Sequence, residues 1–289
     1  MAAVQSMTAF ARREASFPWG SLMWEIRSVN HRYLEIQFRL PDTLRHLESG
    51  FRDLLRERLG RGKVDSTLRL QIHDASATRL SLDRELLEKL HNACREIEAL
   101  GELERPSSID LLRWPGVISE AEPDLDAIAV DSRALLESTI DELIAMRTRE
   151  GGTLARFLRE RLDAIATIVA QLERRLPEIL GAQRQKLLER CAELGVELDR
   201  ERLEQEIVLI AQKSDVAEEL ARIRTHVEET RRALDKGGAC GRRLDFLMQE
   251  FNREANTLSS KSLSGDTTQS AVELKVLIEQ MREQVQNIE

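Results

Sequence analysis

The spacing of apolar residues changes once along this chain of 289 residues, and that change constrains the fold more than any other feature. Up to about residue 72, apolar side chains often recur at every second position, which is typical of half-buried strands. Beyond that point they recur at intervals of three and four residues, which indicates amphipathic helices. The sequence therefore predicts an α+β fold: a small N-terminal sheet-plus-helix domain followed by a long, mostly α-helical C-terminal domain.

Three segments of the N-terminal part carry the strand pattern. Residues 24–27 and 34–40 alternate apolar with polar side chains, and residues 64–72 place most of their apolar side chains at even positions. A helical face lies between the second and third segments, starting after Pro41 and stopping at Gly60. This pattern predicts a sheet that keeps one polar face.

Half of the six prolines, Pro106, Pro115 and Pro123, mark a connection between two parts of the chain. The predicted organisation is a basic α+β domain at 1–100, a connection at 101–125 and a helical domain at 126–289. Within the last part, the spacing predicts helices at about 126–175, 178–195, 200–235, 241–262 and 267–288. Gly151–Gly152 is a candidate break in the first of these helices.

The charge of the chain is unevenly distributed. The formal net charge of −8 argues against a protein coated in nucleic acid. Residues 1–73, however, hold 12 Lys and Arg against 8 Asp and Glu, which gives this segment +4 and leaves −12 for the rest. A polyanion therefore remains a candidate partner of the N-terminal part, and ordinary surface variation is the alternative.

The sequence lacks the motifs of several protein classes, which argues against a nucleotide-dependent motor, a Rossmann oxidoreductase, a serine hydrolase and a zinc protease. It contains no Walker loop, dinucleotide glycine fingerprint, Gly-x-Ser-x-Gly elbow or His-Glu-x-x-His helix. Its three cysteines, Cys94, Cys191 and Cys240, are far apart and form no zinc pattern, which favours free thiols in a reducing compartment. With no long apolar run and no signal-peptide pattern, we expect a cytoplasmic protein without a membrane partner.

A stripe of charged residues in the 200–235 segment has a spacing that suits metal ligation. Asp215, Glu219, Arg222 and His226 follow the pattern i, i+4, i+7, i+11, so they lie along one helix face. Their carboxylates and imidazole can hold a divalent cation, with oxygen ligands favouring Mg²⁺ or Mn²⁺. His226 is also a candidate general base. The alternative, which the spacing alone favours, is a set of surface ion pairs.

The 241–262 segment carries a second polar set beside its apolar face. Glu250 and Glu254, one turn apart, are another candidate carboxylate pair for a metal. The residues suited to binding phosphate are Arg242, Arg243, Arg253 and Lys261. Two mid-helix amides, Asn252 and Asn256, are unfavourable by propensity and indicate either recognition or an interhelical network that fixes register or an oligomer contact.

The connection between the first two predicted strands concentrates groups that suit phosphate contact and base stacking. Its candidates are Arg27, Asn30, His31 and Arg32, followed in sequence by Tyr33, and they are joined by Arg61 and Lys63 at the start of the later strand. The alternative is a polar turn with a solvated basic rim.

Five sequence blocks in this order resemble the YicC/YloC family of bacterial endoribonucleases. They are residues 6–10, 25–34, 61–64, 241–262 and 271–275. The similarity spans essentially the whole chain, although members often have Gly where this chain has Ala9 and Ala11. The resemblance implies metal-dependent endonucleolytic cleavage of single-stranded RNA in the cytoplasm, with a role in RNA turnover or small-RNA regulation. It also implies a homo-oligomer, a hexamer with RNA in a central cavity, and RNA-degradation machinery as a candidate partner.

The candidate residues found above can be assigned to roles in the activity that the resemblance implies. The predicted catalytic residues are Glu219, His226, Glu250 and Glu254, and the predicted ligands of a Mn²⁺ or Mg²⁺ ion are Asp215, Glu219, Glu250 and Glu254. The predicted RNA-binding residues are Arg27, Asn30, His31, Arg32, Arg61, Lys63, Arg242, Arg243, Arg253, Asn256 and Lys261. The alternatives are a non-catalytic oligomeric RNA-binding or nuclease-adaptor protein, and a structural oligomer with no RNA role.

Overall fold

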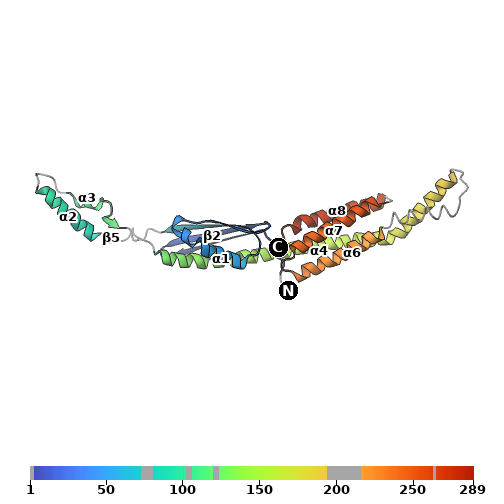
Figure 1. Cartoon of the computed structure of the whole chain (residues 1–289), viewed down its shortest axis with the longest axis horizontal. Coiled ribbons are helices and arrows are strands. Elements are labelled where there is room, and N and C mark those ends of the chain that lie inside the picture. Colours follow the sequence, from blue (N-terminus) through green and yellow to red (C-terminus); the bar gives the residue numbers. More distant parts are fainter. Residues whose placement is uncertain are drawn as a thin grey trace.

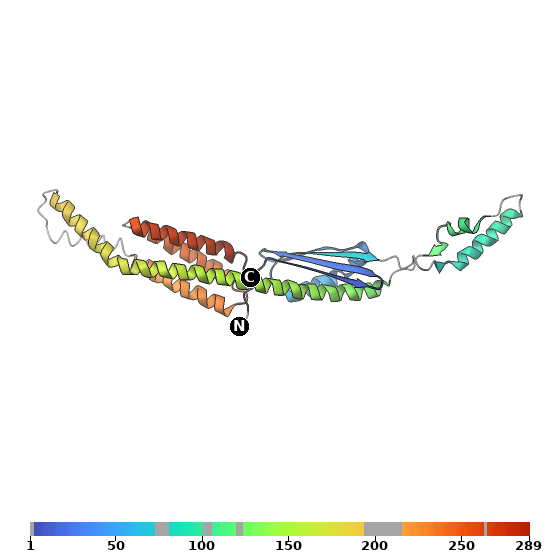
Figure 2. The ribbon, with the colours of Figure 1, turned by 180° about the vertical axis from the view of Figure 1, so that it is seen from behind.

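The molecule is elongated, with its sheet and its helical bundle arranged end to end (Figures 1 and 2). The computed structural model describes residues 3–72, 81–99, 101, 106–119, 124–193, 216–262 and 265–289. In both views one long helix runs beneath the sheet and on into the bundle. The predicted α+β class, with a sheet-plus-helix part followed by a mostly helical part, is confirmed.

The N-terminal part is built on a mixed sheet of four strands. These are β1 (Ala9–Phe17), β2 (Gly20–Val29), β4 (Gly62–Ile72) and β3 (Leu34–Arg39), in that order across the sheet. The β1–β2 and β2–β4 pairs are antiparallel, whereas β3 runs parallel to β4. The three predicted strands are therefore present, and β1, which the sequence analysis did not predict, adds a fourth.

Helices cover one face of this sheet. A 3-10 turn (Asp42–Leu47), helix α1 (Glu48–Arg58) and the first half of α4 (Leu125–Glu193) enclose a core with the inward side chains of the strands. Trp24 is fully buried there, and its Nε1 donates a hydrogen bond of 2.9 Å to the carbonyl oxygen of Ser132 on α4. This contact fixes the long helix against the sheet.

Helix α4 continues through the predicted break at Gly151–Gly152 and through Pro177, so that expectation was wrong. The reason is close packing. A Cβ on Gly151 would lie 2.1 Å from the carbonyl oxygen of Val4, whereas one on Gly152 would meet nothing within 4 Å. Gly151 therefore lets the N-terminal segment lie directly on the helix rather than interrupting it.

The second half of α4 packs with three further helices into a bundle. They are α6 (Ala217–Lys236), α7 (Gly241–Ser260) and α8 (Gly265–Val285), and their apolar stripes share one core with α4. This confirms the helices predicted within 200–235, 241–262 and 267–288, although residues 194–215 lie outside the described part of the chain.

The two ends of the chain meet between the sheet and the bundle (Figure 1). Ser6 forms a β-bridge with Ile288, and the Met7 amide donates to Asn287 at 2.7 Å. Beneath them lies Arg147 of α4, fully buried, whose Nε donates to the Ser6 carbonyl at 2.6 Å and whose Nη2 lies 2.7 Å from a carboxylate oxygen of Glu289. Burial lowers the pKa of Arg147, and the charge of Glu289 acts in the opposite direction.

A small helical hairpin extends from the sheet end. It comprises α2 (Arg84–Glu98) and α3 (Ser108–Leu112), with two short paired strands, β5 (Ser81–Leu82) and β6 (Ile118–Ser119). Within the described part of the chain, no helix is both long enough and apolar enough to cross a membrane.

Candidate active site

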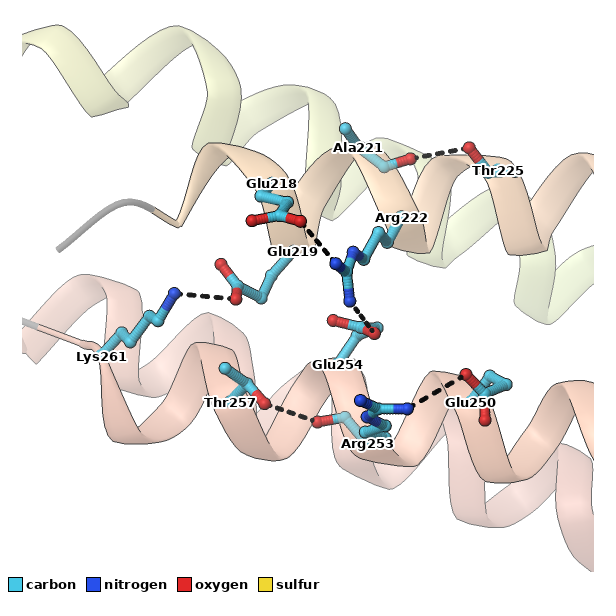
Figure 3. Close-up of polar contacts among 10 residues, drawn as sticks. All are labelled: Glu218, Glu219, Ala221, Arg222, Thr225, Glu250, Arg253, Glu254, Thr257 and Lys261. Atoms are coloured by element: carbon cyan, nitrogen blue, oxygen red, sulfur yellow. Dashed lines mark hydrogen bonds and ion pairs between the residues drawn. The ribbon is translucent and has the colours of Figure 1, made fainter. Parts of the chain in front are cut away.

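The polar flanks of α6 and α7 face each other because the apolar stripes beside them share one core. Leu220, Ile223 and Val227 of α6 are buried against the bundle, as is Phe251 of α7. Packing these stripes together leaves a seam of charged side chains along one side of the helix pair, which Figure 3 shows. We call this seam the α6–α7 groove. On its α6 side lie Glu218, Glu219, Arg222 and His226, and on its α7 side lie Glu250, Arg253, Glu254 and Lys261.

The groove contains one cluster with the composition of a metal site. His226, Glu250 and Glu254 each offer one ligand atom, and these three atoms lie within 4.8 Å of one another. The Nδ1 atom of His226 is buried and has no hydrogen-bond partner among the described residues, so that ring nitrogen is not already engaged by them. Two oxygen ligands on opposite sides of a Mg²⁺ ion stand about 4.2 Å apart. The triad therefore needs only small side-chain shifts to close on a cation.

The triad is rigidly supported at its buried end. Glu254 is 3% exposed, and the His226 ring meets Phe251 edge-on at 5.6 Å between centroids. Glu250 is half-buried and lies one turn before Glu254 on α7. Glu250 is therefore the more accessible of the two carboxylates.

Arg222 connects the triad to a further carboxylate. Its Nη1 donates to Glu254 at 3.3 Å, and its Nη2 donates to Glu218, one turn earlier on α6 (Figure 3). These hydrogen bonds, that to Glu218 most strongly, raise the pKa of the guanidinium and keep it a cation. Arg222 stood in the predicted stripe but was given no site role. Only the packing of α6 on α7 reveals its contact with Glu254.

Glu219 lies in the same groove but outside the triad. It is 5% exposed, and its Oε1 lies 2.9 Å from the Nζ of Lys261 (Figure 3). Its other oxygen, Oε2, is buried without a hydrogen-bond partner among the described residues. A predicted metal ligand and a predicted RNA-binding lysine thus contact each other, and their charges offset across the helix pair. Asp215, the other predicted ligand from this stripe, lies outside the described residues.

Most other predicted phosphate-binding residues of α7 already have partners. Arg253 lies 3.9 Å from Glu250, and Arg243 lies 3.2 Å from Glu229 of α6. Asn256 is exposed on α7.

The predicted basic residues of the sheet part separate into different places. Arg32 and Arg61 line a hollow of about 390 Å³ together with Arg242 at the start of α7. Arg27 lines a separate hollow with Phe10, beside α4.

The remaining three predicted residues, Asn30, His31 and Lys63, line neither of these two hollows. His31 is half-buried, and its Nε2 lies 4.0 Å from Glu35. Lys63 pairs with Val29 in the β2–β4 register, and Asn30 is exposed at the end of β2.

The fold and the groove define a two-part α+β protein with a candidate cation site between two helices. Residues 4–156 match the N-terminal region of the YicC-like endoribonucleases, and residues 172–289 match their C-terminal region. The chain belongs to this family. It is 48% identical over 286 residues to a protein of Haemophilus influenzae named "Probable endoribonuclease YicC", covering 99% of this chain and 100% of the relative. A Clostridioides difficile protein of the same name is 31% identical over 290 residues, covering 98% of this chain and 99% of the relative.

Proposed function

We propose that this chain is a metal-dependent endoribonuclease that cleaves phosphodiester bonds in single-stranded RNA. The observation that carries the proposal is the meeting of His226, Glu250 and Glu254 in the α6–α7 groove. Membership of the YicC-like endoribonuclease family and the names of both relatives support RNA as the substrate.

The donor set of the triad suits Mn²⁺ or Mg²⁺. Two carboxylates are typical ligands of either ion, and the imidazole favours Mn²⁺ over Mg²⁺ because imidazole suits transition metals. A cation held there would supply Lewis-acid charge to a phosphate oxygen and lower the pKa of a bound water. His226 and the two glutamates hold and orient this charge, and the buried position of Glu254 excludes water from one side.

Arg222 adds a fixed positive charge beside the triad. Its side chain is about half exposed, so the guanidinium can face a phosphodiester while its terminal nitrogens stay bonded to Glu218 and Glu254. Preorganised cations of this kind stabilise the charge that develops on phosphate oxygens. Glu219, through its contact with Lys261, holds the spacing of α6 and α7 at the end of the groove.

The remaining expectations belong to the same proposal and are supported by the family resemblance. They are a homo-oligomer, in particular a hexamer, a cytoplasmic location, a role in RNA turnover or small-RNA regulation, and the RNA-degradation machinery as partner. Light scattering on the purified chain measures the oligomer directly, and a monomer would remove that part of the proposal.

A second function has an observation in its favour. Glu219 and Glu254 are each bonded to a cation of the chain itself, which is also how a purely structural interhelical network would look. A non-catalytic oligomeric RNA-binding or nuclease-adaptor protein would use the groove in this way.

Cleavage by the purified chain separates the two functions. We expect a labelled single-stranded RNA to be cut with Mn²⁺ or Mg²⁺ and to stay intact with EDTA. Glu250→Gln and Glu254→Gln should fold normally and cleave at least about 100-fold more slowly, since loss of even an outer-shell partner of a metal ligand costs 10- to 100-fold. The matched control is Glu228→Gln, which changes an exposed carboxylate of α6 that pairs only with Arg232 among the described residues. Equal cleavage by all three variants would exclude the triad, and binding without cleavage by the unchanged chain would favour the adaptor.

A further inference from the structure

The hollow between the sheet part and the start of α7 has features that the α6–α7 groove lacks. Its volume is about 390 Å³, and residues far apart in sequence line it: Arg32 and Tyr33 after β2, Arg61 before β4, and Arg242 and Glu289 from the bundle side. We call it the junction hollow. It exists only where the two parts of the molecule meet.

The arginines of the junction hollow form no ion pair with any carboxylate of the described residues. Among the residues that the structure describes, no carboxylate oxygen lies within 4 Å of a guanidinium nitrogen of Arg32, Arg61 or Arg242. The acidic residue in the lining, Glu289, is already bonded to the buried Arg147 at 2.7 Å. Three arginines without a carboxylate partner among the described residues surround one hollow. Their positive charge favours an anionic ligand, because such a ligand would neutralise it.

One of these arginines is held in a fixed direction. The Nε of Arg61 donates to the backbone carbonyl of His31 at 2.9 Å. Its terminal amino groups remain available for a fork of hydrogen bonds to phosphate oxygens. This preorganisation distinguishes Arg61 from a freely moving surface arginine.

An aromatic side chain adds the second element of recognition. Tyr33 is 62% exposed, and the Arg32 guanidinium lies over its ring at 5.3 Å from the centroid. Nucleobases stack on exposed aromatic rings, and arginine planes extend such stacks. An acidic peptide would use the arginines but would gain little from the exposed ring.

We propose that the junction hollow is a nucleotide-binding subsite for single-stranded RNA, separate from the triad. Arg61 and Arg242 bind a phosphate between the two parts of the molecule, and Tyr33 with Arg32 stacks the adjoining base. The subsite rests on the proposed function for its substrate class. Arg242 stands eight residues before Glu250 on α7, which is about 12 Å along the helix axis. A strand anchored in the hollow is thereby held within a few nucleotides of the groove.

Binding without cleavage tests the subsite independently of the triad. A fluorescent single-stranded oligoribonucleotide is titrated with the full chain in EDTA at several salt concentrations. Arg61→Gln and Arg242→Gln should each weaken binding and reduce the slope of log K against log salt by about 0.7, because each removes one phosphate contact. Tyr33→Ala should weaken binding about 5- to 150-fold and leave the slope unchanged, because stacking is electrically neutral.

The control is Arg232→Gln, which removes the same charge from an exposed arginine paired with Glu228. It should bind RNA like the unchanged chain, and a thermal melt of each variant verifies folding. Unchanged affinity and slope in all three hollow variants would overturn the subsite, as would tight binding of poly-glutamate with no binding of RNA. Normal binding by these variants combined with lost cleavage in Glu254→Gln would remove the subsite and leave the proposed function intact. Lost binding in the hollow variants combined with normal cleavage by Glu254→Gln would support the subsite and exclude the triad as the site of cleavage.

Discussion

Two neighbouring residues of α7, Arg242 and Arg243, show how differently the junction hollow and the α6–α7 groove use the same side chain. Arg243 turns toward α6 and lies 3.2 Å from Glu229, whereas Arg242 lines the hollow with no carboxylate within 4 Å among the described residues. The groove pairs each of its cations with a carboxylate of the chain, and among the described residues it leaves His226 Nδ1 and Glu219 Oε2 without hydrogen-bond partners. In the junction hollow, the guanidinium groups of Arg32, Arg61 and Arg242 form no ion pair with a carboxylate of the described residues. The first arrangement suits a small cation, and the second suits a polyanion.

The largest effect should come from the buried arginine beneath the hollow. Arg147→Met leaves the carboxylate of Glu289 and the carbonyl of Ser6 without their donor, and removing one partner of a buried pair costs about 3–5 kcal/mol. Urea denaturation should show this loss in the free energy of unfolding. The control Arg149→Met, two residues along on the exposed side of α4, should change it by less than about 0.5 kcal/mol. Equal stabilities of the two variants would mean that the meeting of the chain ends contributes little.

Metal binding should stabilise the groove and not the hollow. At a Mn²⁺ concentration 100 times its dissociation constant, the unchanged chain should gain about 2.7 kcal/mol in free energy of unfolding. His226→Ala should lose most of this gain because one of the three ligand atoms is removed. Arg242→Gln should keep it. Thermal melts with and without Mn²⁺ measure the difference, and a full gain in His226→Ala would contradict the triad.

The glycine pair of α4 offers a smaller effect with a built-in control. Gly151→Ala forces a Cβ to within 2.1 Å of the Val4 carbonyl, which should cost about 1–3 kcal/mol as overpacking. Gly152→Ala meets nothing within 4 Å and should stabilise the helix by about 0.5–1 kcal/mol. Opposite signs in adjacent residues would confirm that the N-terminal segment sits directly on α4. Two stabilising substitutions would show that this contact is absent in solution.

The sequence predicted the elements better than it predicted the partners of the side chains. Alternation and helical spacing located β2, β3, β4 and the bundle helices, because burial on one face imposes a period on each element. β1 was missed because Ala9–Phe17 contains charged and small residues on both faces. The glycine pair was misread as a break because spacing within one helix carries no information about what packs on it.

The same limit applies to the candidate site. Glu250, Glu254 and His226 were predicted as separate groups on two helices, and the convergence of those groups depends on the register between α6 and α7. The spacing along the helix made Glu219 as good a candidate as the triad members. Tertiary packing, however, places it against Lys261. The junction hollow could not be predicted from any one segment, since its lining comes from four distant stretches of sequence.

The smallest predicted effect concerns Cys240, which sits between Ala239 of the hollow lining and the first turn of α7. Burial raises the pKa of its thiol above the ordinary value of 9.0. The folded chain therefore keeps the proton when the unfolded chain has lost it. The associated stability is fully present below the ordinary thiol pKa and is lost as the pH rises through the higher folded value. Urea denaturation between pH 7 and 10 should show a steeper decline for the unchanged chain than for Cys240→Ala.

The rate of alkylation measures the burial of the Cys240 thiol directly. It also tests whether RNA binds in the junction hollow, which adjoins Cys240. In a Cys191→Ser background, the half-buried Cys94 of α2 should react first and Cys240 only slowly. If the junction hollow binds RNA, an oligoribonucleotide should slow the reaction of Cys240 further and leave Cys94 unchanged, because only the former adjoins the hollow. Equal protection of both thiols would point to a general effect of RNA on the chain, and rapid reaction of Cys240 without RNA would show that the start of α7 opens in solution.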